Sequence, residues 1–409
     1  MTLRAIELPP HVAVDSLGPG FPSLDRACRT LAFAAAGDVY IHRLDGDEFE
    51  LASRTAGDAP GGRPSGLPAL SADASRVAFD SAAPLVPGVA SPHDQVYVRE
   101  LRARETLLAS VSPIGEPADA ANLGLDTGLA ISADGAHVAF SSYATNLVPD
   151  DRNGAVDVFV RALGPGVTER ASSSSEGAEA HGDSGFPSLS GDGGLVAFSS
   201  AAEDLVPGDA NGLRDVFVRD RSAGTTELIS AASGSRAGDG ASDLPRISAD
   251  GRFVAFASDA TNLVPDDTNG ARDVFLFDRE LGRLARLSGD ASSSEGPSDQ
   301  PHVSDDGSRV AFLSRLADPK GDGTPRQQLV LHDVPTGQRW VVSSAADGQL
   351  GDDDSGDWGL ALSGDGRCVA FASLASNLGG GRAPALYVAR VPTLRRADPG
   401  DRGGAKSGL

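Results

Sequence analysis

The sequence predicts an all-β protein, a single seven-bladed β-propeller whose blades are four-stranded antiparallel sheets. Three observations lead to this prediction. A strand-like segment that ends in Ala-Phe occurs seven times in 409 residues, each copy belongs to a unit with four apolar segments, and apolar residues fall on both faces of those segments. Gly 50 and Pro 26 are also abundant, which suits many tight turns and disfavours a helical bundle.

The internal repeat is the strongest signal in the chain. Leu-Ala-Phe or Val-Ala-Phe ends at seven positions that lie 46, 61, 58, 58, 56 and 59 residues apart. A long, regular period of this kind is typical of propellers, in which each repeat forms one sheet. The seven phenylalanines are Phe33, Phe79, Phe140, Phe198, Phe256, Phe312 and Phe371.

Each unit contains four predicted strands. In the unit of Phe198, residues 186–190 (FPSLS) precede the Ala-Phe strand, and residues 215–220 (DVFVRD) and 225–230 (TTELIS) follow it. In DVFVRD the two valines point to one face and Phe217 points to the other, so both faces are apolar. A sheet covered on both faces must lie between two neighbours, and seven sheets around an axis meet this demand.

Closure of the ring requires a tie between the first and last blades. The segment 11–16 (HVAVDS) has the spacing of an outer strand but no earlier blade of its own. We therefore expect it to complete blade seven beside 385–390 (ALYVAR), with 393–397 (TLRRA) as the alternative. The predicted organisation is an N-terminal strap over 1–17, a propeller over 18–397 and a loose polar tail over 398–409.

The repeat also carries a family resemblance. The pattern S-x-D-G-x-x-V-A-F-x-S-x-A-x-N-L-V-P-x-D-x-N-G-x-x-D-V-F-V-R-D runs almost unbroken through 248–278 and 132–161. It resembles the bacterial TolB-type, WD-repeat-like propeller repeats, and the resemblance covers residues 20–390. Propellers of this family serve as interaction platforms, as accessory domains of peptidases and in proteins of unknown role, so the resemblance implies the fold and no single activity.

Charge and composition exclude several classes of partner. Asp+Glu 57 against Lys+Arg 35 gives a net charge of -22, which repels nucleic acid and anionic lipid. We expect a monomer without membrane insertion. The chain as written shows no signal peptide and favours the cytoplasm, with a periplasmic or secreted location as the alternative. Cys28 and Cys368 fall in neighbouring blades of the ring, and we expect them to be free thiols. A disulfide bond between them is the alternative, but the sequence does not supply the Cα separation that it requires.

Strand order places all the long loops on one face. Loops between strands two and three emerge beside those that lead to the next blade, and long loops on a rigid scaffold often carry binding residues. We expect this face to bind a protein partner; the alternative is that its charge only keeps the loops soluble. Its acidic residues include Asp150, Asp151, Asp209, Asp266, Asp267, Glu176, Glu179, Asp183, Asp239, Asp243, Asp352, Asp353 and Asp354.

The motif D-x-N-G-x-x-D recurs three times in the first class of loop. Oxygen ligands at positions 1, 3 and 7 with a turn-forming Gly suit Ca²⁺, although the Glu at position 12 of an EF-hand is missing. We favour an Asn-Gly turn in which Asp side chains cap backbone N–H groups without a metal, with Ca²⁺ binding as the alternative. The candidate ligands are Asp151, Asn153 and Asp157, then Asp209, Asn211 and Asp215, then Asp267, Asn269 and Asp273.

No catalytic motif stands out. Residues 181–187 (HGDSGFP) resemble the nucleophile segment of chymotrypsin-like proteases, but parallel loops read GASDLP and GPSDQP, so we interpret the match as coincidence. We expect His42 and His332 to be surface substitutions, and Trp340 and Trp358 to be packing residues. The predicted function is a non-catalytic scaffold without a required cofactor. The alternatives are a Ca²⁺-dependent glycan or surface binder and an accessory domain of a hydrolase or peptidase.

Overall fold

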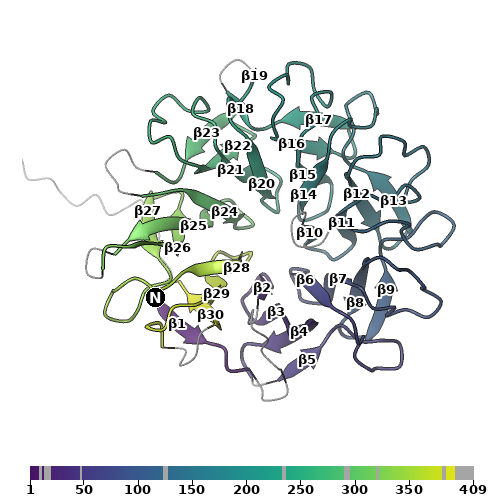
Figure 1. The fold of residues 1–409 in the computed structure, drawn as a ribbon, viewed down its shortest axis with the longest axis horizontal. Coiled ribbons are helices and arrows are strands. Elements are labelled where there is room, and N and C mark those ends of the chain that lie inside the picture. The colour runs from purple at the N-terminus through teal and green to yellow at the C-terminus, as the bar shows by residue number, and fades with distance from the viewer. Residues whose placement is uncertain are drawn as a thin grey trace, which may run out of the picture.

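The computed structural model describes residues 1–8, 12, 20–46, 48–122, 128–232, 236–289, 295–318, 322–379 and 384–391. These residues form seven four-stranded antiparallel sheets around a central axis, together with one two-stranded hairpin, and they contain no helix (Figure 1). The predicted seven-bladed β-propeller is therefore confirmed.

In blades one to six the strands run in chain order from the axis outward (Figure 1). Blade one is β2 (Gly20–Leu24), β3 (Thr30–Ala35), β4 (Asp38–Arg43) and β5 (Phe49–Leu51). Blade two is β6 (Ser65–Leu70), β7 (Arg76–Ser81), β8 (Gln95–Glu100) and β9 (Glu105–Leu108). Blade three is β10 (Leu129–Ile131), β11 (His137–Ser142), β12 (Asp157–Ala162) and β13 (Val167–Arg170). Blade four is β14 (Ser184–Leu189), β15 (Leu195–Ser200), β16 (Asp215–Asp220) and β17 (Thr225–Leu228). Blade five is β20 (Ser242–Ile247), β21 (Phe253–Ser258), β22 (Asp273–Asp278) and β23 (Arg283–Arg286). The hairpin between them is β18 (Ala231–Ala232) and β19 (Arg236–Ala237).

The last two blades show how the ring ends. Blade six is β24 (Ser298–Val303), β25 (Arg309–Ala317), β26 (Pro325–Asp333) and β27 (Gln338–Val341). Blade seven takes three strands from the end of the chain, β28 (Ser355–Leu362), β29 (Cys368–Ser373) and β30 (Ala385–Arg390), and its outer strand from the start, β1 (Thr2–Ala5).

The hydrophobic core consists of layers between neighbouring blades. Phe217 on β16 packs towards blade three, whereas Val216 and Val218 pack towards blade five. Phe198 on β15 stacks beside Phe217 with ring centroids 5.7 Å apart. The two-faced apolar pattern of DVFVRD thus reflects a sheet that is covered on both sides.

The turns between strands one and two link all seven blades through backbone hydrogen bonds. We call this set the inter-blade belt. In each bond an N–H of one turn donates to a carbonyl of the next blade, with N···O distances from 2.8 to 3.3 Å, and the last bond returns to blade one. The seven bonds are Arg26 to Ala72, Ala72 to Ala133, Asp134 to Gly191, Gly191 to Ala249, Ala249 to Asp305, Asp305 to Gly364 and Asp365 to Arg26.

The N-terminal strand closes the ring, but it is not the predicted segment. Thr2 pairs with Arg390 and Ala5 with Tyr387 along the β1–β30 ladder. The assignment of residues 11–16 to this position is therefore wrong, because it relied on spacing to the next blade and ignored the shorter TLRA segment nearer the terminus. Within residues 11–16, only Val12, which is buried, belongs to the described residues. The alternative strand 393–397 and the tail 398–409 lie outside them.

A disulfide bond joins blades one and seven, so the expectation of free thiols is also wrong. Cys28 lies in the turn between β2 and β3, and Cys368 begins β29. Their Cα atoms are 6.0 Å apart across 340 residues of sequence, and both side chains are buried. Sequence spacing alone cannot supply this separation; only the closed ring brings the two residues together.

Removal of the disulfide should weaken the closed ring. We expect Cys28→Ser to lower the free energy of unfolding by about 2–4 kcal/mol, because the unfolded chain loses a long-range constraint. Cys368→Ser should cost the same, and the double variant no more than either single variant, as measured by thermal unfolding. Titration of unfolded, unreduced protein should find no free thiol, and two free thiols per chain would contradict the assignment.

A half-buried carboxylate in blade two, that of Asp80, lowers the stability of the folded protein at neutral pH. Burial raises the pKa of Asp80 on β7 to about 6, and the carboxylate of Asp94 raises it as well. One oxygen of Asp80 has no hydrogen-bond partner. Blades three and four have Ser141 and Ser199 at the same position of the second strand.

Replacement of Asp80 by Ser should therefore stabilise the protein at neutral pH. Above pH 6 the folded protein must hold an ionised carboxylate that burial disfavours, whereas below about pH 4 the group is protonated in both the folded and unfolded states. We expect the variant to gain up to about 3 kcal/mol at pH 7.5 and to lose this gain as the pH falls towards 4. Denaturant unfolding at both pH values is the measurement, and a gain that does not depend on pH would contradict the explanation.

Candidate functional site

The long-loop face carries the candidate site. Its first loops join strands two and three, as in 143–156, 201–214 and 259–272, and its second loops lead to the next blade, as in 171–183 and 229–241. The turns on the opposite face are short, for example 190–194 and 221–224. The D-x-N-G-x-x-D motifs lie at the point where a first loop enters the third strand of its blade.

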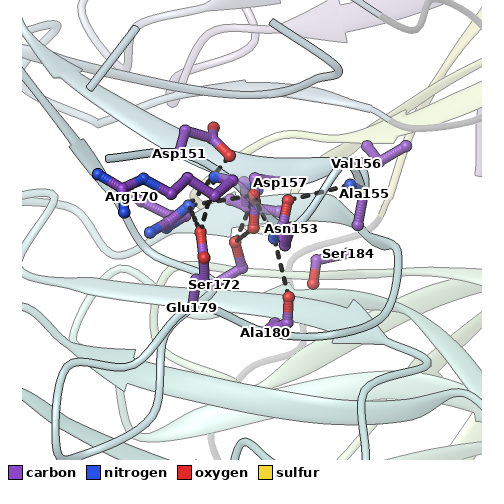
Figure 2. A network of polar contacts seen from close by, with 12 residues as sticks. Asp151, Asn153, Ala155, Val156, Asp157, Arg170, Ser172, Glu179, Ala180 and Ser184 are labelled. Carbon is purple, nitrogen blue, oxygen red and sulfur yellow. Dashed lines mark hydrogen bonds and ion pairs between the residues drawn. The ribbon is translucent and has the colours of Figure 1, made fainter. Parts of the chain in front are cut away.

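In blade three the motif forms a network that ties both loops to the sheet (Figure 2). Asp157, the first residue of β12, is fully buried and accepts hydrogen bonds from the Oγ of Ser172 and from the Nδ2 of Asn153, the latter at 2.8 Å. Nδ2 of Asn153 also donates to the carbonyl of Ala180 at 2.8 Å, and its Oδ1 accepts the N–H of Ala155 at 3.0 Å.

An arginine compensates the charge of this network. Arg170 ends β13, and its Nη1 lies 3.3 Å from Asp151, 3.4 Å from Asp157 and 2.9 Å from Glu179 (Figure 2). Burial raises the pKa of Asp151 to about 6, with a further rise from Asp157, while Arg170 acts in the opposite direction. The Arg170 guanidinium therefore forms ion pairs with three carboxylates in a largely buried environment.

Blade five repeats the arrangement. Asn269 donates to Asp273 at 2.9 Å, and Ser288 donates to the other oxygen of Asp273 at 2.6 Å. Nη1 of Arg286, which ends β23, lies 2.8 Å from Asp267 and 3.3 Å from Asp273. The two acidic positions of the motif are thus bridged by a guanidinium of the same chain in both blades.

Blade four has the same hydrogen bonds but a different outer strand. Asn211 donates to Asp215 at 2.7 Å and to the carbonyl of Gly238 at 2.9 Å. The last residue of β17 is Leu228, at the position of Arg170 and Arg286. Asp209 is 5% exposed and one of its oxygens has no partner. Burial raises its pKa to about 6, and the carboxylate of Asp215 raises it further.

Two blades without the motif achieve the same tie with a neutral side chain. Gln95 of blade two accepts from Ser110 at 2.8 Å and donates through Nε2 to the carbonyl of Ala118 at 3.2 Å. Gln328 of blade six likewise accepts from Ser343 at 2.7 Å and donates to Gly351 at 3.0 Å. One glutamine thus replaces the Asp and the Asn, so the shared role of this position is to hold the third strand against the loop between blades.

The structure therefore brings the seventh and third positions of each motif together, and links the first position to them through an arginine in two blades. The side chain that caps the turn is the Asn rather than the Asp, because its Oδ1 accepts a backbone N–H two residues later. In the described part of the chain, no group of three or more His, Cys, Asp or Glu side chains is arranged to hold a metal ion.

Sequence reasoning missed the partners of the motif. Arg170 and Arg286 follow the last Asp of their motifs by 13 residues, and Ser172 and Ser288 follow it by 15. This recurrence at equal spacing in two repeats is the signal that would have found them.

Several acidic residues of the long-loop face have structural roles. Asp183 accepts the N–H of Val156 at 2.9 Å, and Asp239 accepts that of Thr261 at 2.7 Å. Asp352 and Asp354 likewise accept the backbone N–H groups of Ser376 and Gln327. Asp243 forms an ion pair with the guanidinium of Arg272. By contrast, the exposed carboxylates of Glu116, Glu176 and Asp266 make no hydrogen bond or ion pair with other described side chains or backbone groups.

The other candidate residues are parts of the scaffold. Ser184 is 1% exposed and donates to Ser200 at 2.9 Å, which supports the interpretation of 181–187 as a coincidental match. His42 is 2% exposed and stacks on Phe49 with ring centroids 4.1 Å apart, so its prediction as a surface residue is wrong. The outer strand β5 covers it. His332 is half-buried on β26, and its Nδ1 is buried.

The two tryptophans lie on strands, as expected. Trp340 on β27 packs against the core layer between blades six and seven. Trp358 on β28 lies against Gly20, where a Cβ added to the glycine would come within 2.9 Å of the Trp358 Cβ.

Comparison with known proteins shows the fold alone. No family model matches the sequence, and no curated protein matches it. Among solved structures, the chain is similar to an oligogalacturonate lyase in complex with manganese (TM-score 0.56, 15% identity, 91% of this chain and 89% of that chain). It is also similar to the acylaminoacyl peptidase of Pyrococcus horikoshii (TM-score 0.50, 10% identity, 87% of this chain and 48% of that chain).

TolB from Acinetobacter baumannii is another match, with a TM-score of 0.44, 15% identity and coverage of 90% of this chain and 78% of that chain. The chain therefore shares the propeller fold with the lyase and with part of the peptidase. Its resemblance to TolB-type repeats rests on the sequence motif. None of the described residues forms a helix that is long and apolar enough to span a membrane.

The network of blade three gives a direct test of charge compensation. Arg170→Leu would leave Asp151, Asp157 and Glu179 without their guanidinium, and we expect it to cost about 3–5 kcal/mol of stability at neutral pH. Arg152→Leu is the matched control, because the Arg152 side chain is exposed and, among the described residues, forms an ion pair with the exposed Asp150 alone. It should cost less than about 1 kcal/mol. Equal losses in thermal unfolding would show that the network does not depend on the buried charge.

Proposed function

We propose that this protein is a non-catalytic binding platform that engages a protein partner through its long-loop face. The observation that carries the proposal is the set of exposed carboxylates on that face that hold nothing in the protein itself. Glu116, Glu176 and Asp266 come from three different loops, and the scaffold beneath them is a closed ring of four-stranded sheets. Unpaired acidic groups on a fixed frame suit a partner with a basic surface, because complementary charge steers association.

Exposed apolar residues in the same loops support a protein partner. Ile114 is 80% exposed in the loop between blades two and three, and Tyr143 is 43% exposed at the start of the 143–156 loop. The two loops are adjacent, since the N–H of Tyr143 donates to the carbonyl of Ala121 at 3.2 Å. Aromatic and aliphatic anchors beside charged groups are typical of protein interfaces.

The disulfide bears on where such binding takes place. Disulfides persist in oxidising compartments and are rare in the cytosol. The Cys28–Cys368 bond therefore supports the periplasmic or secreted alternative over the cytoplasmic one, and we propose that the protein acts outside the reducing cytosol.

The proposal is tested by charge removal on one face at a time. Wild-type protein, a long-loop variant (Glu116→Gln, Glu176→Gln, Asp266→Asn) and an opposite-face variant (Asp45→Asn, Glu48→Gln, Glu105→Gln) are immobilised and exposed to extract from the native host. We expect a protein that wild type retains at low salt to be retained at least tenfold less by the long-loop variant and equally by the opposite-face variant. Equal retention by all three, or no retained protein, would contradict the proposal.

A further inference from the structure

The starting observation is a difference among equivalent positions in five blades. In blades two and six a neutral glutamine of the third strand occupies the equivalent buried site. In blades three and five the site holds two aspartates with an arginine between them. Blade four has the two aspartates, Asp209 and Asp215, and Leu228 where the arginine would be.

The blade-four pair is buried as deeply as its counterparts. Asp209 is 5% exposed, Asp215 is fully buried, and one oxygen of Asp209 has no hydrogen-bond partner. Asp215 is held by Asn211 and Ser230, as its equivalents are, so its carboxylate is fixed in place. The exposed Glu203 adds negative charge beside the pair, at a position where blades three and five have Thr145 and Thr261.

The geometry of the sister blades defines where a positive charge must lie. In blade five a single nitrogen of Arg286 is 2.8 Å from Asp267 and 3.3 Å from Asp273. Asp209 and Asp215 occupy the corresponding positions of the motif in blade four. Two buried carboxylates without a compensating charge are strongly unfavourable, because each has lost its hydration.

We propose that Asp209 and Asp215 of blade four bind one calcium ion, which replaces the arginine of blades three and five. Both protein ligands are carboxylate oxygens, the type that Ca²⁺ prefers, and water fills its remaining coordination positions. Asn211 is not a ligand, because its Oδ1 accepts the N–H of Leu213 at 2.8 Å. Its Nδ2 positions Asp215 for the ion.

The proposal is specific to blade four and is tested with Ca²⁺ itself. Calorimetric titration of chelator-treated wild-type protein should show one site per chain with millimolar or tighter affinity, and saturating Ca²⁺ should raise the melting temperature. Leu228→Arg should supply the guanidinium internally, so its melting temperature without Ca²⁺ should rise and its response to Ca²⁺ should disappear.

Two further variants act as matched controls. Thr225→Arg adds the same charge at the exposed start of β17, at the far end of the strand from Leu228, and should leave the Ca²⁺ response unchanged. Arg286→Leu converts blade five into the blade-four arrangement and should raise the number of Ca²⁺ ions bound from one to two. Leu228 shows that this fold accepts leucine at the position.

The proposal is overturned if wild type gives neither heat nor a melting shift at 10 mM Ca²⁺. It is also overturned if Leu228→Arg and Thr225→Arg change the response equally, since the ion would then bind only to diffuse surface charge. Stabilisation by Leu228→Arg without any Ca²⁺ response in wild type would show that a proton, not a metal, neutralises Asp209.

Discussion

The seven backbone hydrogen bonds of the inter-blade belt require a closed ring. The turn of each blade bonds to a neighbouring blade on both sides. Blade seven must therefore meet blade one before the last bond, from Asp365 to Arg26, can form. Two devices secure this meeting, the β1–β30 ladder and the Cys28–Cys368 bond. The core layers depend on the same closure, because every sheet is apolar on both faces and an unclosed ring would expose two of them.

Within this closed ring, different blades use different side chains for the same structural role. The third strand of a blade must be held against the loop to the next blade, and the side chain that does so is buried. A glutamine meets the need without charge, whereas an Asp-Asn pair makes stronger hydrogen bonds but introduces a charge that must be compensated. The D-x-N-G-x-x-D motif therefore has a structural role, and the blades that carry it differ in how they compensate its negative charge.

The fold could be predicted because the repeat is regular and its sequence signals are local. Alternation within DVFVRD and the seven Ala-Phe segments need no knowledge of distant contacts. The disulfide, the closing strand and Arg170 could not be derived in the same way, since each depends on which residues the ring brings together. Cys28 and Cys368 are 340 residues apart, and TLRA is too short and too polar to stand out as a strand. His42 was misassigned for the same reason, because the cover that Phe49 provides is a tertiary contact.

The pairing of Thr2 with Arg390 sets the two ends of the described chain side by side in one sheet. A propeller built in this way has no structural need for its polypeptide to begin where it does. If a short linker joined the ends and a new break were made in an exposed turn such as 221–224, the covalent chain would cross from blade seven to blade one, and the belt would be unchanged. The order of blades along the gene is thus one of several circular permutations that encode the same ring.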